Sequence, residues 1–434
     1  MKDIFKIFIP TLLSNSTFIL INLIDGAFVG NLFGLEGQTA VGLVLPILLI
    51  CSAFIFALTI GGNTYLGHAI GKKAPEESNK IFSHLVIYGT IFISIIVLLL
   101  LLLFYPIILQ KIDNVGVLKY FQQYLFILLP AYIFLYLAIS LGFIQRLKGN
   151  SKVLIYQAEI ALITDVIFNY LFAVVLNLSM LGIALASALS YIFQFLYIVY
   201  SFKKEKTNLK VKFFKFDKKL FSKIVINGLS DGIYDIAASL TQLLNITLLS
   251  IFIYEVAPSY VYVLNNILMT QLIIFFSLSD SINPLISVEY GKKNYYNIIK
   301  YRNSALKLSF VIGIISYLVI NLIKNPLLIM LGVNNINDQT YLLNYSTIYF
   351  LVVLVFGLNQ TLVAYLTAIG RGKLSLILGI MRNIIMIILV TVVLTYFFQE
   401  VGLWSAYFVA ELLSFVVIIL ILRIKNPLKS ENVL

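Results

Sequence analysis

Long apolar segments constrain the fold of this chain more than any other feature. About twelve of them, each roughly 20 to 30 residues long, follow one another from residue 4 to residue 424. A helix of that length spans a bilayer core of roughly 30 Å. Hydrophobic residues make up 61% of the 434 residues and charged residues only 12%, which leaves too little polar surface for a soluble protein. A membrane β-barrel would show shorter segments of alternating polarity.

We therefore expect an all-α integral membrane protein with twelve transmembrane helices. The helices are predicted at residues 4–32, 40–70, 83–109, 119–146, 152–176, 181–202, 220–253, 259–290, 302–331, 339–369, 374–396 and 401–424.

The basic residues indicate how the chain is inserted. If the N-terminus is cytoplasmic, nearly all lysines and arginines lie on the cytoplasmic side, and the opposite side holds only Lys111, Lys119 and Lys324. This asymmetry is what the positive-inside rule requires of a multi-pass protein with both termini in the cytoplasm, here at the plasma membrane. The net charge of +12 is then explained by attraction to anionic membrane lipid, and no nucleic acid partner is expected.

A displacement of 220 residues reveals an internal repeat. It aligns residues 71–73 with residues 291–293, both of which read Gly-Lys-Lys, and it aligns Pro106 with Pro326. We expect one six-helix bundle in 1–202, a basic cytoplasmic linker in 203–219 and a second bundle in 220–434. Six helices are an even number, so the two bundles would share one orientation and be related by a pseudo-two-fold axis along the membrane normal. Transporters built in this way alternate access around a substrate at the interface.

Ionisable residues inside the first-half helices are candidates for coupling transport to an ion. Each costs roughly 2.5–3.5 kcal/mol at the bilayer centre, so each needs a reason. Asp25 shares a helix face with Asn22, and Asp165 lies one turn from Asn169. Carboxylate and amide oxygens at Asp25, Asp165 and Asn169 suit a proton or a sodium ion. Alternatively, each aspartate only forms hydrogen bonds with a neighbouring helix.

The second half contains a similar set of polar residues. Asp235, Gln242 and Asn245 form a stripe along the seventh predicted helix. Further candidates within predicted spans are Asp280, Arg382 and Glu411. The last two are expected to form an ion pair, which is either structural or part of the mechanism.

Several segments together resemble the multidrug and toxic compound extrusion (MATE) family, in its bacterial branch. They read LINLIDGAFVGNLFG in the first helix, LITDVIFNYLFAVV in the fifth, and SDSINPLISVEYGKKN at the end of the eighth. The resemblance covers nearly the whole chain. It implies two six-helix bundles that form a V-shaped cleft, and efflux of drugs or metabolites in exchange for protons or sodium ions.

The resemblance also implies roles for individual residues. A family member with a cation site in the first bundle pairs a first-helix Asp with an Asn and an Asp in the fifth helix and a Thr in the sixth. These positions match Asp25, Asp165, Asn169 and Ser187, with the fifth-helix Asn and Asp exchanged in order. The family's seventh-helix acid matches Asp235.

We therefore expect a monomeric secondary antiporter that exports small organic compounds, cationic or aromatic, in exchange for protons or sodium ions, without a cofactor. One alternative is a flippase or exporter of a specific metabolite or lipid-linked substrate. A more distant one is a membrane-embedded transferase. The sequence contains no Asp-rich cluster, P-loop or metal-spaced Cys/His set, which argues against an enzyme.

Overall fold

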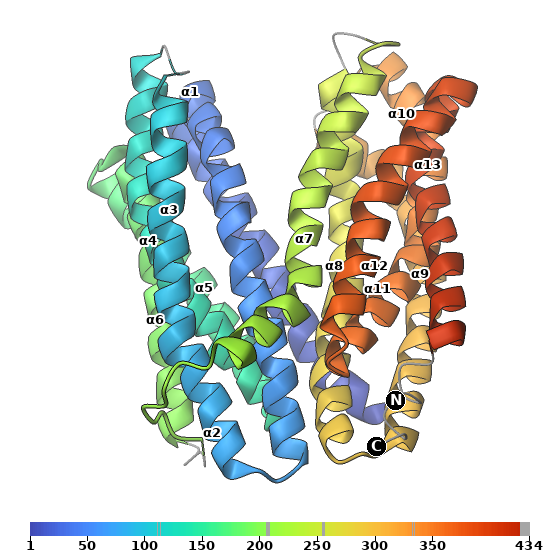
Figure 1. The fold of residues 1–434 in the computed structure, drawn as a ribbon. Helices are drawn as coiled ribbons and strands as arrows, with labels where there is room; N and C mark the ends of the chain where they lie inside the picture. The colour runs from blue at the N-terminus through green and yellow to red at the C-terminus, as the bar shows by residue number, and fades with distance from the viewer. Residues whose placement is uncertain are drawn as a thin grey trace. The chain divides into compact units, whose positions relative to one another are not determined.

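The computed structural model describes residues 1–110, 112, 114–204, 209–253, 257–331, 333 and 335–425. Within these ranges the chain is almost entirely helical and forms no β-strand (Figure 1). The expectation of an all-α fold is therefore confirmed.

The first half contains helices α1 to α6. The longest, α1 (Lys2–Gly71), is two helices, Lys2–Gly34 and Glu36–Gly71, because Gly34 takes a left-handed conformation (φ 58°) between them. Short π-helical turns extend two of the other helices, at His84–Gly89 and Tyr170–Val175. The remaining bounds are α2 Pro75–Ser83, α3 Thr90–Leu109, α4 Val115–Leu147, α5 Lys152–Asn169 and α6 Ser179–Lys204.

The second half contains helices α7 to α13. Their bounds are α7 Lys218–Leu249, α8 Ala257–Gly291, α9 Tyr295–Met330, α10 Ile336–Tyr349, α11 Val353–Ala368, α12 Gly372–Ile380 and α13 Ile387–Lys425. A 3₁₀ turn at Phe350–Val352 joins α10 to α11, and a π-helical turn at Met381–Met386 joins α12 to α13.

The described residues contain twelve membrane-spanning helices, as predicted. Eleven apolar helical stretches are long enough to cross a bilayer, and the last, Gly372–Ile424, has 53 residues. A straight helix of that length would extend roughly 80 Å, more than twice the bilayer core of about 30 Å. Gln399 (φ 52°) breaks this stretch into two helices. The chain doubles back there, because a Cβ on Gly402 would lie only 2.0 Å from the carbonyl oxygen of Leu394.

The 220-residue repeat is visible in the backbone. Lys73 and Lys293 have φ angles of 56° and 57°, and Ser179 and Gln399 have φ angles of 59° and 52°. Left-handed conformations are uncommon for residues other than glycine, so two matched pairs at one spacing indicate a shared backbone plan. Helices also end at Gly71 and Gly291 and begin at Lys152 and Gly372, which are the same distance apart. The axis that would relate the two bundles stays a prediction.

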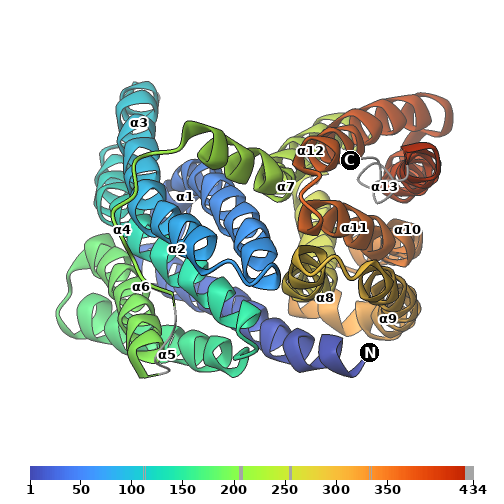
Figure 2. The ribbon, with the colours of Figure 1, turned by 60° about the horizontal axis from the view of Figure 1, so that its bottom comes forward.

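Packing divides the chain into two units, each with its own hydrophobic core (Figures 1 and 2). The first unit is Phe5–Gly232, and the second unit is Met1–Ile4 together with Ile233–Leu434. The beginning of α7 belongs to the first unit because it packs closely on α1: a Cβ on Gly228 would lie 2.1 Å from the carbonyl oxygen of Ala57. The bundle boundaries at residues 202 and 220 stay a prediction.

The described non-helical part of the linker, residues 209–217, lies along the first unit. The ammonium group of Lys80 pairs with Asp217 at 2.7 Å. The backbone N–H of Asp217 donates to Nε2 of His84 at 3.0 Å, and that of Lys212 donates to the Ser83 hydroxyl at 2.9 Å. The end of the linker is therefore held by several side chains of one helix surface.

Candidate functional site

Helices α1, α5 and α6 bring four polar side chains of the first unit together. The carboxamide nitrogen of Asn169 donates to Oδ1 of Asp25 at 2.7 Å and to Oδ2 of Asp165 at 2.9 Å. The Ser187 hydroxyl donates to the other carboxylate oxygen of Asp25 at 3.2 Å. One amide group thus bridges two carboxylates. We call Asp25, Asp165, Asn169 and Ser187 the acidic cluster.

The acidic cluster is largely withdrawn from solvent. Asp165, Asn169 and Ser187 are buried and Asp25 is half-buried. Oδ1 of Asp165 and Oδ1 of Asn169 are buried without a hydrogen-bond partner, and no ion pair of the described residues involves either carboxylate. Buried polar oxygens normally have a partner, and hard cations prefer oxygen ligands. The cluster therefore has the composition to accept a proton or a sodium ion.

The local sequence explains how α5 presents its two polar side chains. Asp165 and Asn169 are four residues apart and so lie on one face of the helix. Immediately after Asn169 the helix widens into the π-helical turn Tyr170–Val175. Turns of this kind occur frequently at functional sites. The predicted juxtaposition of Asp165 with Asn169 is thus present, and it extends to Asp25 and Ser187.

Two residues near the cluster differ from expectation. Asn22 is exposed and donates to the carbonyl oxygen of Phe18 in its own helix at 3.1 Å, so the structure does not place it with Asp25. Tyr124 of α4 is buried and lies within electrostatic range of both carboxylates. Sequence reasoning missed it, because one tyrosine among 27 carries no distinguishing signal.

The second unit contains the expected ion pair between Arg382 and Glu411. Nε of Arg382 donates to both carboxylate oxygens of Glu411 at 2.9 Å, and the two side chains are at most 1% exposed. A second guanidinium nitrogen donates to Oε1 of Gln360 at 3.0 Å. The Asn359 amide donates to Glu411 at 2.5 Å, and the guanidinium also lies 4.6 Å from the centre of the Phe356 ring. The pair is therefore neutralised and hydrogen-bonded.

The sequence analysis did not identify Asn359 and Gln360 as members of this network. The available signal was two adjacent amide residues within an otherwise apolar stretch of α11. Because a buried polar side chain needs a partner, this pair could have been assigned to the buried charges of the second half.

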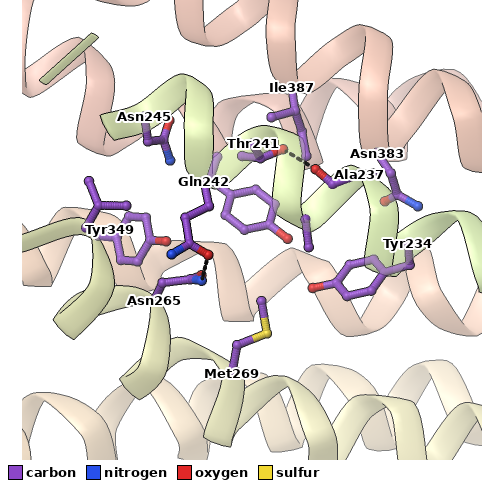
Figure 3. A pocket seen from close by; sticks show the side chains of 13 residues that line it. Tyr234, Ala237, Thr241, Gln242, Asn245, Asn265, Met269, Tyr349, Asn383 and Ile387 are labelled. Atoms are coloured by element: carbon purple, nitrogen blue, oxygen red, sulfur yellow. Dashed lines mark hydrogen bonds between the residues drawn. The ribbon is translucent and has the colours of Figure 1, made fainter. Parts of the chain in front are cut away.

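The other predicted residues of the second half do not belong to the network around Arg382 and Glu411. Gln242 and Asn245 of α7 line a pocket, where Gln242 accepts a hydrogen bond from Asn265 at 3.3 Å (Figure 3). Asp280 is half-buried in α8 and is not among the residues that line this pocket. The side chain of Asp235 lies outside the part of the chain that the structure describes.

Comparisons with known proteins identify the family of this chain. The family model MatE matches residues 10–171 and 236–393. The multidrug export protein MepA of Staphylococcus haemolyticus (strain JCSC1435) is 23% identical over 98% of this chain and 94% of its own length.

Solved structures share the fold over nearly the whole chain. One is described as the outward-facing conformation of a multidrug resistance MATE family transporter of the MOP superfamily; it has a TM-score of 0.91 at 19% identity and covers 99% of this chain and 96% of its own. A MOP superfamily transporter from Pyrococcus furiosus Vc1 (DSM3638), described as having a binding pocket of reverse polarity, has a TM-score of 0.90 at 20% identity, with the same coverage.

The family match covers most of the chain, and the matched parts contain Asp25 and Asp165 and most of the residues that line the second-unit pocket. The expected resemblance is confirmed, and the alternative of a membrane-embedded enzyme is set aside, because the family is one of transporters. This chain therefore belongs to the MatE family, and it is a multi-pass membrane transporter.

Proposed function

We propose that this transporter is a secondary antiporter, which exports organic compounds in exchange for protons or sodium ions, and that the acidic cluster is its cation-coupling site. The observation that carries the proposal is the bridging of Asp25 and Asp165 by one amide, in a buried place without a cationic partner among the described residues.

The physical reason is the cost of two adjacent negative charges in a medium of low dielectric constant. Two ionised carboxylates this close repel each other, and burial removes the water that would stabilise them. A proton shared between them, or a sodium ion held by Asp25, Asp165 and the free oxygen of Asn169, relieves both penalties. The exchanged order of Asp165 and Asn169 keeps one carboxylate and one carboxamide in the site.

Cation binding can then control transport. A ligand shifts a conformational equilibrium only by its difference in affinity for the two states. If the cluster binds its cation more tightly in one state, occupation favours that state and release favours the other. Each charge moved across the membrane supplies roughly 2.3 kcal/mol per 100 mV, which is enough for a substrate gradient of more than tenfold.

Three further observations support the proposal. The relative from Staphylococcus haemolyticus is named a multidrug export protein. The bias of lysine and arginine favours cytoplasmic termini in the plasma membrane, which is where an exporter acts. The repeated backbone plan is typical of transporters that alternate access, and we propose a monomer that needs no cofactor.

The test is export of ethidium from proteoliposomes under an imposed proton gradient and, separately, under a sodium gradient. The wild type should export with one of the two gradients, and Asp25→Asn should lose at least nine-tenths of that export while staying folded. The matched control is Glu159→Gln, an exposed acid of α5 outside the cluster, which should transport like the wild type.

Full export by Asp25→Asn would contradict the assignment of the coupling site. No export by the wild type with either gradient would contradict drug antiport and would favour a specific metabolite or lipid-linked substrate.

A further inference from the structure

The basic linker is a part of the first unit that the coupling proposal does not use. Its segment 209–219 contains one acid, Asp217, and five lysines, which are Lys210, Lys212, Lys215, Lys218 and Lys219. All five lysines are exposed, whereas Asp217 is paired with Lys80. The segment also contains Phe213, whose side chain is 87% exposed, more than any other large hydrophobic side chain that the structure describes. Water solvates lysines well but not an exposed aromatic ring.

Hydrogen bonds place the linker along one continuous helical surface (Figure 1). The backbone N–H of Lys210 donates to Oδ1 of Asn79 at 2.8 Å, and the Tyr88 hydroxyl donates to the carbonyl oxygen of Phe214 at 2.6 Å. Asn79 and Tyr88 are nine residues apart, which corresponds to roughly 13 Å of helix. The linker therefore reaches from α2 to the π-helical turn His84–Gly89.

The helix face that follows Tyr88 is a lipid-facing surface. Four exposed aliphatic residues of α3 continue the face of Tyr88 at spacings of three and four, and they are Ile91, Ile95, Leu98 and Leu102. In a helix that crosses a bilayer, an exposed row of this kind contacts the hydrocarbon of the lipids. Because Tyr88 bonds to the linker, the linker lies directly before this row. Its aromatic residues are thus at the boundary between membrane and water.

The charge of the linker matches one partner at this boundary. In the proposed orientation the bias of lysine and arginine places the linker on the cytoplasmic side. The cytoplasmic leaflet carries anionic lipid, and each lysine near such a surface raises the affinity roughly fivefold. Aromatic rings are favoured at the same level of the bilayer. One lipid can therefore satisfy both kinds of exposed side chain.

We propose that the linker is a binding surface for anionic phospholipid. Lys210, Lys212 and Lys215 bind the phosphate groups, and the ring of Phe213 inserts beside the first carbons of the acyl chains. The inference goes beyond the proposed function, because it rests on the orientation of the chain and not on the acidic cluster.

The test is cleavage of the wild-type protein by trypsin, which cuts after lysine, in nanodiscs of phosphatidylglycerol or of phosphatidylcholine. Cleavage after Lys212 and Lys215 should be at least fivefold slower in phosphatidylglycerol, relative to cleavage after Lys73 in the same molecules. Lys73 is an internal control, because it is exposed and lies before α2, roughly 20 Å of helix from Tyr88. Attraction of trypsin to the anionic surface affects both sites.

Two variants separate insertion of the ring from a general effect of exposed apolar groups. Phe213→Ser should reduce the protection by phosphatidylglycerol to less than twofold. The matched control is Phe397→Ser, because Phe397 is also strongly exposed (69%) but lies in α13, outside the linker. That variant should be protected like the wild type.

A fluorescence measurement tests the same contact directly. Phe213→Trp combined with Trp404→Phe leaves one tryptophan, located in the linker. Titration with phosphatidylglycerol in detergent should shift its emission to shorter wavelength, whereas inorganic phosphate should not. In this reporter, Lys212→Gln combined with Lys215→Gln should lower the lipid affinity at least tenfold. The control pair, Lys72→Gln with Lys73→Gln, should leave it unchanged.

Equal relative cleavage in the two lipids would overturn the proposal, and so would a tryptophan emission that phosphatidylglycerol does not shift. An equal shift with phosphatidylcholine would overturn the preference for anionic lipid. A shift with inorganic phosphate alone would show an anion site without lipid insertion and would also overturn it. Asp25→Asn should be protected like the wild type, so a failure of the coupling proposal leaves this test independent.

Discussion

At the residue scale, the two buried charged sites of this transporter differ in whether their charge is balanced. In the second unit, Arg382 and Glu411 form a fully buried pair whose further hydrogen bonds go to Asn359 and Gln360. In the acidic cluster, Asp25 and Asp165 share only neutral partners. The charges of Arg382 and Glu411 cancel, so this pair needs no added ion. The two carboxylates of the acidic cluster have no positive partner among the described residues, so a bound cation would stabilise them. The second-unit pair is therefore structural in this account.

If the pair is structural, replacing one of its two residues should destabilise the protein more than replacing both. Arg382→Met leaves a buried carboxylate unpaired, and such losses cost about 3–5 kcal/mol. We expect a large fall in the thermal midpoint of unfolding of the purified protein. Arg382→Met combined with Glu411→Gln should recover part of that fall. As a control, removing the exposed pair of Lys72 and Glu77 should cost no more than about 1 kcal/mol. A single variant as stable as the wild type would contradict this reading.

At the scale of elements, small residues let α1 and α7 approach each other within the first unit. Ala53, Ala57 and Gly61 follow each other at four-residue spacing, as do Gly228 and Gly232 on α7. Cβ atoms on these glycines would lie 1.9 to 2.3 Å from carbonyl oxygens of the facing helix. Close backbone contact of this kind is characteristic of helix packing in membranes.

A methyl group at Gly61 should therefore separate the two helices. A Cβ there would lie 1.9 Å from the Ile224 carbonyl oxygen, so Gly61→Ala should destabilise the protein by about 1–3 kcal/mol. The control is Gly42→Ala in the same helix, where a Cβ meets nothing within 4 Å. That change should be neutral or slightly stabilising, because alanine favours helix. Thermal unfolding in detergent compares the stability of the two variants. Equal changes in the thermal midpoint would contradict the packing of α1 on α7.

The linker contact has a defined pH dependence. The hydrogen bond from the Lys80 ammonium group lowers the pKa of Asp217 from its ordinary 3.8 to about 2. A carboxylate with a lowered pKa in the folded protein stabilises its contact above the ordinary pKa and loses that effect as the pH falls towards the lowered one. The contact between Lys80 and Asp217 should therefore hold at neutral pH and be lost between about pH 4 and pH 2, which loosens the end of the linker.

Pepsin, which is active in that range, can measure the detachment. Cleavage within residues 209–217 should accelerate between pH 4 and pH 2 in the wild type, relative to a denatured reference. Asp217→Asn should already be cleaved rapidly at about pH 4, because it lacks the carboxylate. An identical pH profile for the two proteins would show that Lys80 and Asp217 do not hold the linker.

The sequence predicted the individual helices better than it predicted the side-chain contacts between helices. Apolar length and the breaks between segments predicted all twelve helices, but some ends are displaced by about two helical turns; α9, for example, begins at Tyr295 rather than at residue 302. The spacing of Asp165 and Asn169 predicted their contact because both lie on one helix. The second-unit pocket could not be predicted, because it needs the rotation of several helices about their axes, and hydropathy does not determine that rotation.

At the scale of the whole molecule, the two halves of the repeat share backbone features but differ in their buried polar groups. The left-handed residues Lys73 and Lys293 match at a spacing of 220 residues, as do Ser179 and Gln399. Among the described residues the buried polar groups differ, with an acidic cluster in one unit and a neutralised ion pair in the other. We infer that the first unit senses the cation.

The most direct test of this account is the charge movement caused by cation binding alone. Membranes containing the purified protein are adsorbed on a solid support, and the current is recorded after a jump in proton or sodium concentration without substrate. The wild type should give a transient current with one of the two ions. Asp25→Asn and Asp165→Asn should each abolish it, and Glu159→Gln should retain it. An unchanged current in both aspartate variants would show that the coupling cation binds elsewhere.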